Sequence, residues 1–285
     1  MNYRHGFHAG NFADVLKHAI LVALLKQLVA KDKPLVYLET HAGAGRYLLN
    51  DPLEHSPRTP EYTEGVLPLL KARRVGDALL PYLHLVRQFN GMPEHPLSIY
   101  PGSPLLAAAS TRECDRLEFC ELQADEAARL TAEFRGDGRV RVHQRDGYAA
   151  LKALLPPTPR RGLVLIDPPF EQADEADAIV QALRDATTRW AQGVYAVWYP
   201  IKRRADVQPL LRALAALPVT RALTAELCVH SDDTALRLNG SGVVVLNPPY
   251  RFDKTLAALL PELFRLLGQS RYGRHEWRWL KHGPD

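Results

Sequence analysis

The first clear periodicity in the chain lies near its start, in the stretch GNFADVLKHAILVALLKQLVAKDK. Apolar residues recur there every four positions, from Leu16 to Leu28, which places them on one face of an α-helix. Asn11 precedes the pattern as a candidate N-cap, and the segment Lys-Asp-Lys-Pro at 31–34 ends it. The pattern therefore predicts one helix between these two signals.

Beyond residue 34, short apolar runs alternate with longer amphipathic segments, as strands alternate with helices. A Pro-rich, helix-like stretch from about 51 to 96 interrupts the alternation, and Ser103 is the predicted N-cap of a further helix with Pro104 at its first position. Strands are predicted within 34–45, 116–122, 139–144, 162–169, 193–200, 219–229 and 242–249, and helices at 124–134, 148–155, 174–190, 207–217 and 254–267.

Strands that alternate with helices favour a parallel α/β sheet. The last two predicted strands have no helix between them, and the turn RLNGSG that joins them contains Asn-Gly, a strong hairpin signal. The final strand is therefore expected to run antiparallel to the others. This order is typical of the Rossmann-like class I fold of S-adenosylmethionine-dependent methyltransferases, a mostly parallel seven-stranded sheet with an antiparallel last strand.

Composition narrows the class of protein. Hydrophobic residues make up 46% of the 285 positions, so the chain can bury a large core, and a net charge of +4 permits a nucleic-acid partner without requiring one. Three cysteines without paired spacing suggest a reducing compartment, and no apolar signal region opens the chain. The longest apolar run, 19–25, is far shorter than the ~20 residues of a membrane span. We expect a cytoplasmic protein without membrane association, and nothing requires more than a monomer.

The first predicted strand ends in the turn Glu-Thr-His-Ala-Gly-Ala-Gly. Ligands of doubly wound sheets sit at the carboxyl ends of the strands, and glycines there let backbone N–H groups approach them. A dinucleotide site would need a third glycine where this chain has Leu48, whereas a methyltransferase site needs an acidic residue and then a turn of small residues. Gly43 is therefore a candidate cofactor contact, with a purely structural turn as the alternative.

Acidic residues follow the next two predicted strands. Glu121 ends one of them, where a carboxylate can accept both ribose hydroxyls of an adenosine. Asp146 comes just after the other, where it can accept from the adenine amino group, and Gly147 lets a backbone N–H reach the ring. One such acid alone is usually a solvated surface residue. A glycine turn, Glu and Asp at three strand ends favour a site for S-adenosylmethionine.

The fourth predicted strand ends in the stretch IDPPF. An exocyclic adenine amine is a poor nucleophile, and a carboxylate with a backbone carbonyl can accept its two N–H groups. Asp167 offers the carboxylate, Pro168 the carbonyl and Phe170 a face for a flipped base. A plain proline turn is the alternative.

A similar stretch, LNPPY, ends the antiparallel strand, so Asn247 is expected at the opposite edge of the sheet as a strand terminator.

Charged and histidine side chains crowd the first eighteen residues. The histidines do not follow a zinc-ligand spacing, so no metal is expected. Lys17 and His18 lie one turn into the predicted helix, where they could meet the carboxylate of a bound amino-acid moiety. A solvated helix face is the alternative.

Several motifs together resemble the RlmJ family, bacterial enzymes that methylate adenine N6 in 23S ribosomal RNA. They are YRHGFHAGNFADVLKH, YLETHAGAGRY, YPGSP, FCELQ, RDGY and IDPPF. The likeness spans essentially the whole chain. It implies S-adenosyl-L-methionine as cofactor, S-adenosyl-L-homocysteine as product, Asp167 as proton acceptor, and Tyr3 and Arg4 as substrate-facing residues. It implies cofactor contacts from His18, His41, Ser103, Glu121, Asp146, Gly147 and Asp167.

The resemblance also implies a single methyltransferase domain over 1–285 with a small helical insertion after the first motif. The gap between Gly45 and Arg116 is about twice the ~30 residues of a plain βαβ unit, which agrees with such an insertion. We divide the chain into an N-terminal arm and helix at 1–33, an insertion at 51–97 and a basic aromatic tail at 268–285.

Basic residues gather in WYPIKRR, at 198–204, and in the tail, where they alternate with aromatic residues. Such a mixture suits a phosphate backbone and exposed bases, although a solvated C-terminal helix would explain the tail equally well. The expected partner is 23S ribosomal RNA, as protein-free or partly assembled RNA, with no obligate protein partner. The alternatives are a DNA adenine-N6 methyltransferase and a non-catalytic RNA-binding relative.

Overall fold

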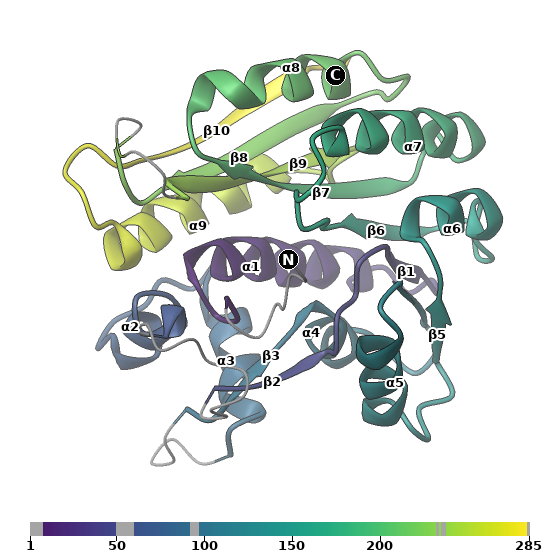
Figure 1. Cartoon of the computed structure of the whole chain (residues 1–285), viewed down its shortest axis with the longest axis horizontal. Helices are drawn as coiled ribbons and strands as arrows, with labels where there is room; N and C mark the ends of the chain where they lie inside the picture. Colours follow the sequence, from purple (N-terminus) through teal and green to yellow (C-terminus); the bar gives the residue numbers. More distant parts are fainter. Residues whose placement is uncertain (1–7, 50–59, 92–96, 232–233, 235–237, 284–285) are drawn as a thin grey trace.

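The computed structural model describes residues 8–49, 60–91, 97–231, 234 and 238–283. Its centre is an eight-stranded sheet in the order β10-β8-β9-β7-β6-β1-β4-β5 (Figure 1). The strands are β1 (Val36–Glu39), β4 (Arg116–Glu121), β5 (Val140–Gln144), β6 (Gly162–Ile166), β7 (Val194–Ile201), β8 (Ala222–Cys228), β9 (Gly240–Leu246) and β10 (Arg274–Lys281). The first five run parallel, β9 is antiparallel to β7 and β8, and β10 is antiparallel to β8.

Helices cover both faces of the sheet (Figure 1). One face carries α6 (Gly147–Leu154), α7 (Glu175–Arg189) and α8 (Arg204–Ala215), which share a hydrophobic cluster with the strands. The other carries α1 (Phe12–Val29), α4 (Ser103–Ser110), α5 (Ala124–Glu133) and α9 (Phe252–Leu267), which share a second cluster. The sheet is thus the middle layer of three, which explains its continuous apolar strands.

Helix α1 begins where the sequence predicts, because the Asn11 side chain accepts hydrogen bonds from the backbone N–H groups of Ala13 and Asp14. Every residue from 13 to 25 is buried, since the helix lies between the sheet and the helices of the insertion. The alternative of a solvated face at Lys17 and His18 is therefore wrong.

Among the described residues, no helix has both the length and the apolar character to cross a membrane.

The predicted architecture is confirmed, and the central sheet has one strand more than expected. The parallel order β5-β4-β1-β6-β7 and the antiparallel β9 inserted between β7 and β8 are those of a Rossmann-like class I methyltransferase sheet. The additional strand is β10, within the segment 268–285 that the sequence presents as a basic tail. Its alternating residues place Trp277 and Trp279 against the second cluster, on the face that carries α1 and α9, and Glu276 pairs with Arg204. The sequence of β10 does alternate with a period of two, but its many charged residues obscure the alternation.

The predicted insertion packs against the start of α1. Its described parts are a short 3-10 turn (Glu61–Thr63), α2 (Val66–Lys71) and α3 (Leu80–Gln88). Two strands that the sequence did not reveal, β2 (Arg46–Leu48) and β3 (Ile99–Pro101), pair antiparallel at its base. Val66 N donates to Gly10 O at 2.8 Å, and a Cβ on Gly65 would lie 2.0 Å from the same oxygen. This close contact fixes the insertion to the N-terminus of α1.

Candidate functional site

The carboxyl ends of four parallel strands meet at one edge of the sheet. β1 lies between β4 and β6, and β5 lies beside β4, in parallel register. The residues after these strands are therefore neighbours in space although Gly43 and Asp167 are 124 positions apart. This edge holds the predicted residues Gly43, Glu121, Asp146, Gly147 and Asp167.

The glycine turn after β1 is tied to the end of β4. Gly43 has φ +62°, and its N–H donates to Glu121 Oε2 at 2.8 Å. Glu121 Oε1 accepts from Gln123 N at 2.8 Å, so both oxygens are held while each keeps a free lone-pair direction. A Cβ at Gly43 would lie 2.3 Å from the Tyr47 hydroxyl. The predicted proximity of Gly43 and Glu121 is thus present, with a carboxylate oriented for further donors.

The turn after β5 packs closely on β1. Asp146 is the N-cap of α6, because its Oδ1 accepts from Ala149 N at 2.6 Å, and its side chain is exposed at the sheet edge. A Cβ on Gly147 would lie 2.1 Å from Thr40 O. Glycine is therefore required here by the close approach of the two backbones.

Lys17 joins α1 to the end of β6. Its Nζ lies 2.5 Å from Asp167 Oδ2 and 2.8 Å from Asp14 Oδ1, and the three side chains are 5%, 13% and 4% exposed. Burial alone would lower the pKa of Lys17, but the two carboxylates outweigh it and raise the pKa. The ammonium group therefore stays charged. Lys17 holds the carboxylate expected to clamp the target amine, and its second partner Asp14 was not foreseen from the sequence.

His18 lies in a buried polar chain. Its side chain is 1% exposed, its Nδ1 is 2.7 Å from the Tyr100 hydroxyl, and the Tyr100 and Tyr82 hydroxyls are 3.0 Å apart. The imidazole and the Tyr100 ring stack with centroids 5.6 Å apart. These tyrosines come from β3 and α3, so the insertion helps to orient His18. That contact was not predictable, because it joins residues 82 positions apart.

Glu39, which ends β1, is fully buried beneath the same edge. Its Oε1 accepts from the Ser103 hydroxyl and its Oε2 accepts from the Tyr37 hydroxyl at 3.0 Å. Ser103 is the first residue of α4 and Gly102 stands at the N-cap position, so the predicted cap was wrong by one residue. The Ser103 hydroxyl serves the carboxyl group instead. Burial raises the pKa of Glu39 to about 8, and nearby Asp167 adds to the rise.

Glu39→Gln is expected to flatten the pH dependence of stability. Because the folded pKa of Glu39, about 8, exceeds its usual value of 4.5, the folded protein keeps a proton that the unfolded chain releases. The free energy of unfolding of the wild type therefore falls as pH rises between these values, by at most about 1.4 kcal/mol per pH unit. Urea denaturation at a series of pH values measures this slope. Equal slopes in wild type and variant would contradict the buried, protonated state.

His41 is half-buried at this edge. Burial lowers its pKa to about 4, against the opposing charges of Asp167 and Asp146. Its Nδ1 lies 2.8 Å from Thr40 Oγ1, and its ring meets Tyr148 edge-on with centroids 5.2 Å apart. His41 is therefore neutral at physiological pH, and it offers a hydrogen bond rather than a charge.

The segment after β6 forms a rigid wall beside Asp167. Pro168 is buried, and Phe170 has φ +51°, which turns the chain sharply. The Phe170 ring meets Trp198 of β7 edge-on with centroids 5.8 Å apart, and Lys17 Nζ lies 6.0 Å from the Trp198 ring centroid. The carboxylate of Asp167 thus lies beside an aromatic wall to which Trp198, unforeseen from the sequence, contributes.

The second proline motif lies at the opposite edge, as predicted. Leu246, the last residue of β9, pairs with Tyr195 near the start of β7. Asn247 Nδ2 donates to Ala191 O and Gly193 O, both at 2.8 Å. The side chain therefore ties the loop before β7 to the end of β9 and takes no part in the candidate site.

Asn247→Ala is expected to leave kcat for methyl transfer within about twofold while lowering the free energy of unfolding by about 1–2 kcal/mol. Two backbone carbonyls lose their donor, but the carboxyl ends of the parallel strands are untouched. Turnover assays and urea denaturation measure the two effects. A hundredfold loss of turnover in folded protein would overturn the assignment of this edge.

The predicted substrate residues Tyr3 and Arg4 lie outside the described residues. Within 8–49, 60–91, 97–231, 234 and 238–283, no three His, Cys, Asp or Glu side chains are grouped to hold a metal ion.

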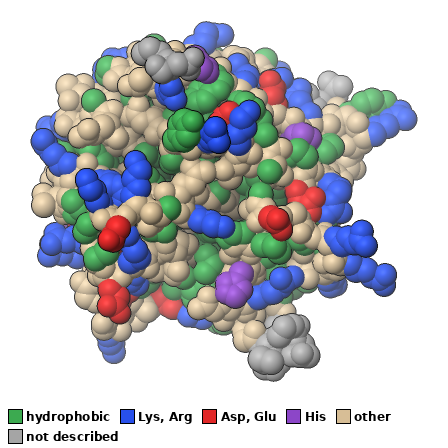
Figure 2. Space-filling view, turned by 180° about the vertical axis from the view of Figure 1, so that it is seen from behind, with side chains coloured by type: hydrophobic (Ala, Val, Ile, Leu, Met, Phe, Trp, Pro, Cys, Tyr) green, Lys and Arg blue, Asp and Glu red, His purple; other side chains and the backbone are tan. Residues whose placement is uncertain are grey.

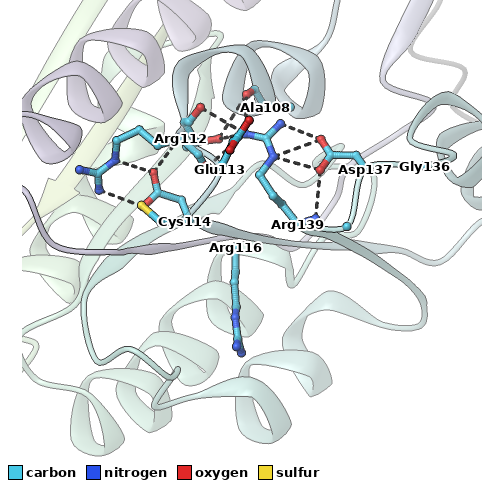
Figure 3. Close-up of a pocket in the computed structure, with 11 residues that line it drawn as sticks. Ala108, Arg112, Glu113, Cys114, Arg116, Gly136, Asp137 and Arg139 are labelled. Carbon is cyan, nitrogen blue, oxygen red and sulfur yellow. Dashed lines mark hydrogen bonds and ion pairs between the residues drawn. The ribbon is translucent and has the colours of Figure 1, made fainter.

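A hollow of about 790 Å³ lies at the other edge of the sheet, beside the starts of β4 and β5 (Figure 3). Arg112 and Arg139 line it and are both engaged. Arg139 pairs with Asp137 at 2.6 Å and donates to carbonyls at the end of α4, and Arg112 pairs with Asp115 and donates to carbonyls after α1. These arginines satisfy the carboxyl ends of two helices, so the hollow has a structural explanation.

Comparison with known proteins gives a consistent set of similarities. A family model described as Ribosomal RNA large subunit methyltransferase D, RlmJ, matches residues 32–281. Two relatives named Ribosomal RNA large subunit methyltransferase J, from Escherichia coli and Haemophilus influenzae, are 40% and 38% identical to this chain, and each match covers 98% of this chain and 99% of the relative. The crystal structure of protein LPL1258 from Legionella pneumophila matches with a TM-score of 0.86 and 36% identity, over 95% of this chain and 98% of that one.

Proposed function

This chain belongs to the RlmJ family of ribosomal RNA large subunit methyltransferases, and on that premise we propose that it transfers a methyl group from S-adenosylmethionine to N6 of one adenine in 23S ribosomal RNA. The observation that carries the proposal is the position of Asp167. Its carboxylate is fixed by Lys17 at the same sheet edge as the glycine turn and Glu121. That edge is where a class I fold binds its ligands.

The described residues fit S-adenosylmethionine. Glu121 would accept from the ribose hydroxyls, and Asp146 from the adenine amino group. Gly147 packs directly on the Thr40 backbone, which fixes the start of α6 beside β1, where a backbone N–H could reach the adenine ring. His41 and Ser103 lie at the same edge and would complete the cofactor contacts, together with the backbone of Gly43 and with His18. When bound, the cofactor supplies the methyl group on a positively charged sulfur.

The chain's own part in the reaction is to hold the amine and take its proton. Asp167 would accept one N–H of the target adenine, and the Pro168 carbonyl the other, which directs the nitrogen lone pair at the methyl group. Once the methyl group has been transferred, the amine must lose a proton, and Asp167 is the carboxylate placed to receive it. Phe170 would stack on the flipped base. Tyr3 and Arg4 remain proposed substrate contacts from the N-terminal arm.

The substrate is tested by methyl transfer from labelled S-adenosylmethionine to three acceptors: protein-free 23S ribosomal RNA, intact large ribosomal subunits and duplex DNA. We expect label as N6-methyladenine in the protein-free RNA. Label in duplex DNA alone would make the protein a DNA methyltransferase. Binding of RNA without transfer would indicate a non-catalytic relative.

A further inference from the structure

Net charge alone does not locate a surface for RNA on this molecule. The chain has 36 Lys and Arg against 32 Asp and Glu. Figure 2 shows Lys and Arg side chains spread over much of one face, with Asp and Glu between them. Because neighbouring opposite charges cancel, a phosphate site requires cations that no carboxylate neutralises.

The basic stretch at 202–204 does not meet this requirement well. Arg203 lies 3.0 Å from Asp206, and Arg204 lies 3.4 Å from Glu226 and also pairs with Glu276 of β10. Arg203 is therefore engaged at the start of α8, and Arg204 joins α8 to strands β8 and β10.

A different group of cations surrounds a hollow of about 450 Å³ between the end of α2 and the end of α9. We call Lys71, Arg73, Arg74 and Arg265 the insertion cluster. Three of these residues are exposed, namely Lys71, Arg73 and Arg74. None of the three forms an ion pair with another described residue. The insertion cluster therefore carries three unneutralised positive charges.

The fourth member holds the hollow in shape. Arg265 pairs with Glu262 at 2.7 Å and donates to Arg74 O at 3.1 Å, and Gly76 N donates to Glu262 Oε1 at 3.0 Å. These contacts tie the connection between α2 and α3 to α9. The backbone that carries Arg73 and Arg74 is therefore fixed in place before any ligand binds.

The insertion cluster lies at the same edge of the sheet as Asp167. Gln269, just after α9, bonds through its N–H to Val229 O, which follows the end of β8, and through its side chain to Glu64 of the insertion at 3.1 Å. β8 runs in the same direction as β7, since both are antiparallel to β9. The insertion in turn contacts the start of α1, whose Lys17 binds Asp167.

We propose that the insertion cluster binds backbone phosphates of 23S ribosomal RNA at nucleotides away from the target adenine. The inference rests on the proposed function and adds the surface that positions the RNA. Phosphate contacts set register and orientation without reading sequence, and the three unpaired cations of the insertion cluster, at the same sheet edge as Asp167, can provide such contacts. The insertion is thereby an RNA-positioning element in addition to a support for α1.

The test is the double variant Arg73→Gln/Arg74→Gln, with Lys31→Gln/Lys33→Gln as matched control. The control removes the same charge from exposed residues after α1, at the opposite edge of the sheet. Affinity for protein-free 23S ribosomal RNA is measured by filter binding at several salt concentrations. We expect the insertion variant to bind about tenfold more weakly and its salt slope to fall by roughly 1.4–1.8, whereas the control stays near wild type.

Equal weakening in both double variants, or none in the insertion variant, would overturn the proposal. Affinity for S-adenosylmethionine and the unfolding midpoint should match wild type, which separates an RNA contact from a folding defect. Failure of the proposed function has a different signature, namely a wild-type protein that does not methylate 23S ribosomal RNA. If the wild type methylates the RNA but the KM of the insertion variant for RNA is unchanged, only the proposed binding of RNA by the insertion cluster is refuted.

Discussion

Asp167→Asn is expected to lower kcat for methyl transfer by at least about a thousandfold while leaving the dissociation constant for S-adenosylmethionine within about tenfold. The amide keeps the shape of the side chain but cannot take the proton of the methylated amine. Its NH₂ group also faces hydrogen-bond donors from which the carboxylate accepted. Lys17 loses one of its two carboxylate partners and keeps Asp14. Single-turnover kinetics on protein-free 23S ribosomal RNA separate the chemical step from binding.

Asp174→Asn is the matched control for this variant. Asp174 lies seven residues further along, is exposed, and makes no capping hydrogen bond to α7. The same substitution there should leave kcat within about twofold. Wild-type turnover in the Asp167 variant would refute its role as proton acceptor, and a loss of cofactor affinity far beyond tenfold would make it chiefly a cofactor ligand.

The sequence predicts which edge of the sheet holds the candidate site, because the arrangement of the strands follows from the alternation of strands and helices along the chain. Once β1, β4, β5 and β6 are parallel neighbours, the residues after them must share an edge. Gly43, Glu121 and Asp167 needed no further information to be placed together. The same rule assigns Asn247 to the other edge, since a hairpin reverses β9, and its pairing register bears this out.

The partners of these residues follow from packing and were not predictable. Lys17 and Asp14 are one helical turn apart, but Asp167 is 150 residues away. Ser103 meets Glu39 across 64 residues, which the N-cap interpretation did not include. Trp277 and Trp279 occur among enough charges to resemble a solvated tail, and only the uncovered edge of β8 makes them part of a strand. Long-range contacts such as those of Lys17 and Ser103 leave no period in the sequence.

Lys17→Met is expected to lower the free energy of unfolding by about 3–5 kcal/mol near pH 8. Methionine has a similar length but no charge, so it leaves the carboxylates of Asp14 and Asp167 buried side by side without their cation. Removing one member of a buried ion group costs more than the group contributes, because the remaining charges stay desolvated. Urea denaturation measures the loss, and Lys254→Met, whose side chain is 75% exposed, should cost less than about 0.5 kcal/mol.

The pH dependence separates this account from a simple packing defect. In the Lys17 variant, both carboxylates favour protonation, so their folded pKa values rise above those of the unfolded chain. The stability deficit should therefore shrink as pH falls toward about 5, and Asp14→Asn/Lys17→Met should recover part of it at pH 8. In the wild type, the raised pKa of Lys17 keeps the ammonium group charged at all pH values below its usual 10.5, so titration of Lys17 itself adds no pH dependence between pH 5 and 8. A deficit that is independent of pH, with no recovery in the double variant, would show that lost packing outweighs charge at this position.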